Sequence, residues 1–347
     1  MFFDAVVGNP PYQIAGSGDN KNFASPVYNL FMQTSFKLAD KVSLIHPARC
    51  LFNAGATPQD FRNEILSDKH FKVIRYDPDG KKFFPTSDIK GGVAITLRDA
   101  TKNFGAIGTF IPFDELISIH QKAVLDNKNF RPLSEIIFSR TIYRLTDKMH
   151  EDFPVASSRQ SQGHPYDMST NILVLLPEIF FDDKPNDGHE YIQILGLTKM
   201  QRVYKWIRRD YVNAPTPLEK FKVLVPHSNG SGALGEVLST PLVGSPLVGS
   251  PLVGHTETFI SVGAFDTRAE AEACMAYIKS KFARALLGIL KVTQHNPPAT
   301  WSKVPLEDFT SGGDIDWHGS VDAQLYRKYK LTDAEIKFIE EHVREMT

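Results

Sequence analysis

The residues best suited to chemistry are Asn9, Pro10, Pro11 and Tyr12, which stand together near the start of the sequence. An Asn side-chain oxygen and a proline carbonyl, fixed side by side, can accept both hydrogens of one amino group. The neighbouring Tyr ring can stack on the planar heterocycle that bears this group. Together these residues would draw the amino nitrogen toward tetrahedral geometry, which makes it a better nucleophile.

The segment before this turn must position it. Residues 5–7 form a short apolar run that predicts a buried strand, and two prolines prevent its continuation as strand or helix. We therefore expect the four residues on a stiff turn at a strand's carboxyl end. There they would act as catalytic residues on an adenine flipped out of a duplex. The alternative is a plain strand-ending turn, because Pro-Pro pairs are common in loops.

A second Asn-Pro-Pro sequence occurs at residues 296–298 and provides an internal comparison. It is followed by Ala299 instead of Tyr, and the residues before it are polar. Without a preceding strand or an adjacent ring, this second copy is predicted to be inert.

Strands and helices alternate around the first turn. A helix is predicted to begin near Ser25, with Ser25 as N-cap and Pro26 as the first helical residue. A second helix is expected over 60–67, and strands are expected over 41–47, 71–76 and 91–99. This alternation predicts a parallel, doubly wound α/β sheet.

The pattern changes near residue 105, which predicts two domains, residues 1–104 and residues 105–347. The second domain is expected to be α+β. Short β-like runs occur at 171–177 and 222–226, and helices are predicted over 267–290 and 332–346. Three copies of Pro-Leu-Val-Gly between Thr240 and His255 favour an extended loop.

One segment of the second domain, residues 197–212, interleaves cations with aromatic rings. Cations neutralise phosphates, and Arg and aromatic side chains can read bases or wedge between them. The candidate contacts to double-stranded DNA are Lys199, Arg202, Tyr204, Lys205, Trp206, Arg208 and Arg209. The alternative is a solvated basic face. The whole chain has a formal charge of −1, so any nucleic-acid contact must be local.

Composition excludes several other classes of protein. The only cysteines, Cys50 and Cys274, are far apart, which predicts neither a disulfide framework nor a zinc site. His46, His70 and His295 lack metal-ligand spacing, so no metal is expected, and no nuclease cluster is evident. The sequence contains neither a signal-peptide pattern nor a membrane-spanning run, and we expect a cytoplasmic protein.

The sequence resembles the γ-class adenine-specific DNA methyltransferases of restriction-modification systems. The resemblance is strongest to the methylase and specificity parts of bifunctional type II enzymes. It rests on FDAVVGNPPYQ at the start, on SLIHPARCLFNAG and FPTSDIKGGVAITL, and on segments extending to LYRKYKLTDAEIKFIEEHV. It implies S-adenosylmethionine as methyl donor, a partial Rossmann-like methyltransferase sheet, and an α+β target-recognition domain.

Two departures from this family modify the expectation. The glycine-rich loop and acidic strand ends that bind S-adenosylmethionine precede the catalytic turn in relatives and are absent here. We expect a protein partner or a missing N-terminal segment to supply the cofactor site, and residues 5–7 to form an exposed apolar edge. Thr96 stands where relatives often have a second stacking ring. The alternatives are a non-catalytic DNA-binding or specificity remnant, and a glutamine or rRNA methyltransferase that uses the same turn.

Overall fold

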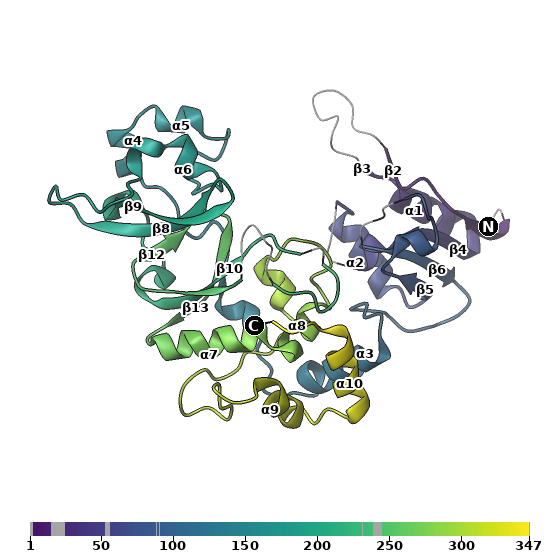
Figure 1. The fold of residues 1–347 in the computed structure, drawn as a ribbon. Coiled ribbons are helices and arrows are strands. Elements are labelled where there is room, and N and C mark those ends of the chain that lie inside the picture. Colours follow the sequence, from purple (N-terminus) through teal and green to yellow (C-terminus); the bar gives the residue numbers. More distant parts are fainter. Residues whose placement is uncertain are drawn as a thin grey trace. The chain divides into compact units, whose positions relative to one another are not determined.

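The computed structural model describes residues 3–14, 25–52, 56–87, 89, 91–230, 232–238 and 245–346 (Figure 1). The chain forms two compact units. The first contains Met1–Ile117 and Ile289–Thr293, and the second contains Ser118–Gly288 and Gln294–Thr347. Each unit has a mixed α/β composition with small sheets.

The sheet of the first unit has four strands in the spatial order β1 (Phe3–Gly8), β4 (Ala39–Pro47), β6 (Val93–Asp99) and β5 (Phe71–Asp77). Strand β1 is parallel to β4, whereas β6 is antiparallel to both β4 and β5. The expectation of an entirely parallel sheet is therefore wrong. A parallel β5–β6 pair would need a crossover, usually a helix. The described part of their connection contains only the 3-10 turn Gly80–Lys82.

Helices α1 (Tyr28–Leu38) and α2 (Gln59–Ser67) pack against this sheet. Their buried residues share one apolar core with the strands, formed by Tyr28, Met32, Val42, Leu44, Phe61, Ile65, Phe71, Ala94 and neighbours. This packing holds β4 and β6 in place, and β1 is held through β4.

The start of α1 differs from the expected one. Residues Ser25–Pro26 form the short strand β3, which pairs with β2 (Gln13–Ile14). The Val27 backbone N–H then donates to the Tyr12 carbonyl at 3.1 Å. These bonds keep the segment extended, so the helix begins at Tyr28, and the prediction of Ser25 as N-cap is wrong. The same bonds tie the segment entering α1 to the Asn9–Tyr12 turn.

Strand β1 is the outer strand of the sheet and pairs only with β4 among the described residues. Val7 is 80% exposed and Phe3 is 58% exposed. The expected exposed apolar edge is thus present, and the chain leaves it directly into Asn9. The prediction of a buried strand over residues 5–7 is wrong, because no second described strand covers the outer side of β1.

The second unit contains two further sheets. One has the order β11 (Leu247–Gly249), β10 (Phe221–Pro226), β13 (Phe259–Phe265) and β7 (Ile137–Phe138), with antiparallel neighbours throughout. The other has the order β12 (Val253–His255), β8 (Tyr191–Thr198) and β9 (Gln201–Arg208).

The Pro-Leu-Val-Gly repeats supply two of these strands. The second copy contributes β11 and the third contributes β12, whereas the first copy, at 241–244, lies outside the described residues. The prediction of an extended loop is therefore wrong for the last two copies. Both strands lie at sheet edges, and the prolines of these copies, Pro246 and Pro251, precede the strands and so take no place in the hydrogen-bond ladder.

The remaining helices are α3 (Asp114–His120), α4 (Asp147–Asp152), α5 (Ala156–Arg159), α6 (Ile172–Leu175), α7 (Arg268–Lys279), α8 (Lys281–Leu287), α9 (Val321–Lys328) and α10 (Asp333–His342). Helix α6 replaces the expected strand at 171–177, because a short apolar run fits a buried helix equally well. The single helix expected over 267–290 is broken at Ser280, whose hydroxyl caps α8 by accepting from the Ala283 N–H.

Candidate active site at the end of strand β1

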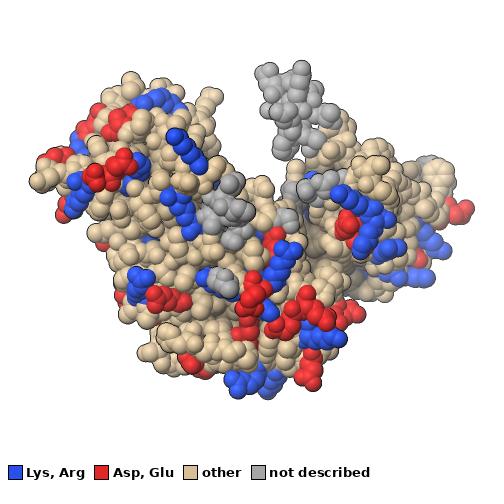
Figure 2. Space-filling model, viewed as in Figure 1, with Lys and Arg blue, Asp and Glu red and all other residues tan. Residues whose placement is uncertain are grey.

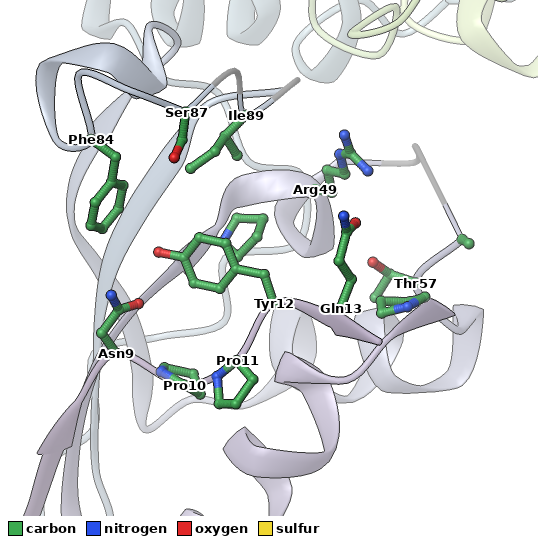
Figure 3. Close-up of a pocket in the computed structure, with 13 residues that line it drawn as sticks. Asn9, Pro10, Pro11, Tyr12, Gln13, Arg49, Thr57, Phe84, Ser87 and Ile89 are labelled. Carbon is green, nitrogen blue, oxygen red and sulfur yellow. The ribbon is translucent and has the colours of Figure 1, made fainter. Parts of the chain in front are cut away.

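A pocket of about 780 Å³ lies at the carboxyl end of β1 (Figure 3). Its lining comes from four places in the first unit: the turn after β1, the short strand β3, the segments after β4, and the β5–β6 connection. The lining residues are Asn9, Pro10, Pro11, Tyr12, Gln13, Pro26, Pro47, Arg49, Ala56, Thr57, Phe84, Ser87 and Ile89. The four residues selected from the sequence as catalytic are thus brought together on one wall.

The first Asn-Pro-Pro sequence differs from the second in exposure. Asn9 is exposed, and its amide lies on the same side of the pocket as the Tyr12 hydroxyl and the Phe84 ring (Figure 3). Asn296 is fully buried, and its side-chain oxygen accepts from the Thr300 hydroxyl at 3.2 Å. Only the first copy therefore presents its amide to a ligand.

Tyr12 projects into the pocket with a buried hydroxyl that has no hydrogen-bond partner among the described residues. Burial raises the pKa of this phenol to about 12, so the hydroxyl stays protonated at neutral pH. The Tyr12 ring meets the Phe84 ring edge to face, with centroids 6.1 Å apart and an interplanar angle of 77°. The two rings form an aromatic corner beside Asn9.

Phe84 is a pocket residue that the sequence did not reveal. From the sequence, Thr96 stands where relatives often have a second ring, whereas in the structure a second ring lines the pocket from the β5–β6 connection, at Phe84. Thr96 lies elsewhere, on β6, with only 2% of its surface exposed, and its hydroxyl bonds to Nε2 of His46 at 3.0 Å. The sequence feature that could have identified Phe84 is the Phe-Phe-Pro sequence before IKGG. It is easily overlooked, because the ring is expected inside the strand that follows IKGG.

The contacts of His46 also indicate a structural role. Its Nδ1–H donates to the Pro47 carbonyl at 2.9 Å, and its ring stacks on Tyr28 with centroids 5.7 Å apart. Burial lowers the pKa of His46 to about 4, so the imidazole is neutral. It supports the segment that carries Pro47 and does not line the pocket itself.

The segment proposed to contact DNA lies mostly on the β8–β9 hairpin. Residues alternate between the two faces of β9, so Arg202, Tyr204, Trp206 and Arg208 share one face and Lys205 projects from the other. Lys199 lies in the turn between the strands, and Arg209 begins the 3-10 turn that follows β9. The structure therefore does not gather all seven residues on one surface.

Most of these cations have acidic partners within the second unit. Lys205 pairs with Asp182, and Arg209 pairs with Glu219 at 3.2 Å. Arg208 pairs with Asp210 at 2.5 Å and with Asp152 at 3.4 Å. On the face shown in Figure 2, blue and red side chains are accordingly intermixed over this unit.

For Arg202 and Trp206 the structure shows contacts with a ring, a cation and a backbone carbonyl. Arg202 donates to the Ser245 carbonyl at 2.5 Å, and its guanidinium lies 5.3 Å from the Phe259 ring centroid. Burial lowers the pKa of Arg202. Tyr204 is 43% exposed, and Trp206 has Lys184 5.8 Å from its ring. Among the candidate contacts, Lys199 and Tyr204 are thus exposed, and Trp206 is half-buried.

The described part of the chain contains no group of three or more His, Cys, Asp or Glu side chains arranged to hold a metal ion. None of its helices is long and apolar enough to cross a lipid bilayer.

Sequence comparison identifies one family and one relative that are similar to parts of this chain. Residues 1–84 match the sequence model of the Eco57I restriction-modification methylase family. The chain is also 35% identical over 99 residues to an uncharacterized adenine-specific methylase of Mycoplasma pneumoniae (strain ATCC 29342 / M129 / Subtype 1). That match covers 28% of this chain and 24% of the relative, so the chain spans about a quarter of that protein.

Structure comparison gives two longer but weaker similarities. The type IIG restriction endonuclease BpuSI matches 97% of this chain and 48% of its own, with 10% identity and a TM-score of 0.34. The type IIL restriction-modification enzyme MmeI, solved in complex with DNA, matches 99% of this chain and 55% of its own, with 9% identity and a TM-score of 0.37. The resemblance stated from the sequence is confirmed for the first unit, whose residues 1–84 are similar to a restriction-modification methylase.

Proposed function

We propose that this chain carries the catalytic turn and the DNA-recognition portion of an adenine-specific DNA methyltransferase of a restriction-modification system. The observation that carries the proposal is the pocket at the end of β1, in which Asn9 and Tyr12 adjoin Phe84. The methylase similarity of residues 1–84 covers this catalytic turn. The four-stranded sheet would then be part of a Rossmann-like methyltransferase sheet.

Asn9, Pro10 and Tyr12 have separate roles in this proposal. The Asn9 side-chain oxygen and the Pro10 carbonyl accept the two hydrogens of the N6 amino group, which draws the nitrogen lone pair out of conjugation with the ring. Pro11 stiffens the turn by fixing its own φ. Tyr12 stacks on the flipped base, and its protonated hydroxyl adds no negative charge near the reacting nitrogen.

S-adenosylmethionine is the proposed methyl donor, and the described pocket lining does not fit it alone. The donor carries a positive sulfonium and a ribose diol, for which carboxylates are suitable partners. No lining residue that the structure describes carries a carboxylate, and Arg49 is cationic. We therefore propose that a protein partner or a further N-terminal segment supplies the donor site beside the exposed edge of β1.

The second unit is the proposed target-recognition domain, and double-stranded DNA is its proposed ligand. Support comes from the accessible aromatic residues of the β8–β9 hairpin and from Lys199 at its turn. The paired cations could contact phosphates only by exchanging their carboxylate partners, so accessible Tyr204 and Lys199 are the stronger candidates.

The test is methylation of chromosomal DNA in a host that lacks adenine methylation. The chain is expressed together with the reading frames that flank its own gene, and N6-methyladenine is mapped by single-molecule sequencing. We expect methylation at one sequence, and Asn9→Ala should lower it by roughly 100-fold or more, as for loss of a transition-state hydrogen bond. Asn103→Ala, which alters an exposed Asn of the same unit, should have no effect.

Two outcomes would contradict the proposal. Absence of methylation with the wild-type chain would favour a non-catalytic DNA-binding protein. Full methylation by the Asn9→Ala variant would show that Asn9–Tyr12 is only a strand-ending turn without a catalytic role.

A further inference from the structure

The pocket has two chemically different halves. Asn9, Tyr12 and Phe84 form an amide and aromatic half, whereas Gln13, Arg49 and Thr57 form a polar half on the other side of the Tyr12 ring (Figure 3). The proposed function uses only the first half. A volume of about 780 Å³ falls in the range of roughly 300–1,000 Å³ typical of sites for whole small molecules. The polar half therefore has room for more than the base.

Arg49 is positioned by the end of β4. The strand ends at Pro47, and the Ala48 N–H donates to the Gly92 carbonyl at 3.0 Å. The 3-10 turn that follows buries the neighbours of Arg49, which are Ala48, Cys50 and Leu51. Their packing fixes the backbone on both sides of Arg49. Among the described residues that line the pocket, Arg49 is the one that carries a positive charge.

Gly91 gives the Arg49 side chain its space. This glycine has a φ of +85°, and a Cβ placed on it would lie 3.2 Å from Cγ of Arg49. A larger residue would be strained in this backbone conformation and would also press on the Arg49 stem. The two glycines of IKGG thus help to orient Arg49 toward the pocket: Gly91 leaves room for its side chain, and the Gly92 carbonyl accepts from the N–H of the preceding residue, Ala48.

Thr57 adds an oriented hydroxyl beside this cation. Its Oγ1 lies 2.6 Å from the buried Tyr28 hydroxyl. When the Tyr28 hydroxyl donates, the Thr57 hydrogen is available to an acceptor in the pocket. Burial raises the pKa of Tyr28, and the positive charge of Arg49 opposes that rise, which is consistent with a guanidinium near this pair.

The polar half is suited to an anion. Arg49 can donate two parallel hydrogen bonds to one phosphate, and the Gln13 amide and Thr57 hydroxyl add neutral donors. None of the described lining residues carries a carboxylate, so an anion in the pocket meets no like charge from them. A flipped nucleotide carries a phosphate joined through its sugar to the base, so a single nucleotide has one group suited to each half of the pocket.

We propose that Gln13, Arg49 and Thr57 bind a phosphate ester of the nucleotide whose base lies against Tyr12 and Phe84. This inference rests on the proposed function for the identity of the base. It adds that the pocket recognises the flipped adenine as a nucleotide, with Arg49 as the main phosphate ligand.

The test compares 2′-deoxyadenosine with its 5′- and 3′-monophosphates, which separate the two possible sources of the phosphate. Binding to the full chain is measured by NMR line broadening and saturation transfer at low salt. One monophosphate should bind about tenfold more tightly than the nucleoside, as expected for charged hydrogen bonds. Added salt should reduce this gain and leave nucleoside binding unchanged.

Variants assign the gain to the polar half. Arg49→Gln should abolish it without changing nucleoside affinity, and Thr57→Val should reduce it severalfold. Phe84→Ala should weaken all three ligands equally. Lys37→Gln, which removes an exposed positive charge from α1 of the same unit, should change none of them.

Several results would overturn the inference. They are equal affinity of nucleoside and monophosphates, a gain that survives Arg49→Gln and Thr57→Val, or a loss in Arg49→Gln of S-adenosylmethionine binding instead of phosphate binding. Failure of the proposed function would look different. The phosphate gain would then persist with 2′-deoxyguanosine nucleotides, and Asn9→Ala and Phe84→Ala would leave every affinity unchanged.

Discussion

The Asn9–Tyr12 turn and the β8–β9 hairpin both concentrate polar and aromatic side chains, but they differ in whether the polar groups already have partners. At the turn, Asn9 is exposed, and the buried Tyr12 hydroxyl has no partner in the described part of the chain. At the hairpin, Arg208 and Lys205 already bond to carboxylates of the same unit. Open polar groups in a pocket can bind a ligand at once, whereas paired cations must first give up their partners. Whether a polar group already has a partner therefore predicts ligand binding better than its residue type alone.

The largest effect should come from acid, because both regions rest on a buried neutral histidine. His46 lies behind the pocket, and His255, behind the hairpin, donates from Nδ1 to the Thr256 carbonyl and bonds through Nε2 to the Ser261 hydroxyl, both at 2.9 Å. Burial lowers the pKa of His46 to about 4 and that of His255 to about 3. The unfolded chain gains protons first, so this stability is complete above about pH 6.5 and is lost as pH falls toward the folded pKa.

We expect the free energy of unfolding of the first unit to fall by roughly 3 kcal/mol between pH 6.5 and pH 4 through His46. All three tryptophans, Trp206, Trp301 and Trp317, lie in the second unit, so tryptophan fluorescence reports that unit and circular dichroism reports both. His46→Gln should remove the first unit's share of the acid sensitivity. An unchanged acid profile in this variant would show that other groups control it.

A matched pair of substitutions separates open hydroxyls from paired ones. The Tyr211 hydroxyl donates to Asp152 at 2.7 Å and accepts from Arg208 at 3.0 Å. Tyr211→Phe should cost roughly 1–2 kcal/mol, whereas Tyr12→Phe should stay within about 0.5 kcal/mol. Urea unfolding followed by circular dichroism measures both. Equal costs would remove the difference between the two regions.

The smallest effect concerns the hairpin turn. Lys199 and Met200 have φ values of 48° and 65°, in the left-handed region that favours Asn and Gly in two-residue hairpins. The left-handed conformation costs about 1 kcal/mol per residue, and the extra chain entropy that Gly loses on folding offsets part of the relief. The double substitution Lys199→Asn and Met200→Gly should therefore stabilise the second unit by a net of about 1 kcal/mol. Thermal unfolding followed by tryptophan fluorescence measures the gain, and a lower midpoint would contradict it. If Lys199 contacts DNA, duplex affinity should fall while stability rises.

The sequence predicted the parts of the site that depend on one continuous segment. Residues Asn9–Tyr12 follow an apolar strand directly, and two prolines leave that segment few conformations. Phe84 could not be selected in this way, because its place beside Tyr12 depends on the path of the β5–β6 connection. Arg49 was not selected either, since its direction depends on a distant glycine, Gly91.

The fold was predictable to a similar extent. Most strands of the first unit were found from their apolar runs, but the direction of β6 follows from pairing across the sheet, which no single segment encodes. The apolar run at 171–177 forms α6 because Ile172 and Leu173 pack into a core that distant strands complete. The pairing of Lys205 with Asp182 likewise joins residues far apart in sequence, so the hairpin looked more basic than it is.

The first unit is discontinuous along the chain, and this has a consequence for dissecting the protein. Ile289–Thr293 belongs to it, and Val292 packs against its apolar core. Ile289 and Leu290 also line a small cavity of about 160 Å³ together with Phe52 and Phe110. A fragment ending at residue 117 would therefore lack part of its own interior. Adding a synthetic peptide spanning 286–296 to that fragment would restore the missing packing, as in fragment complementation.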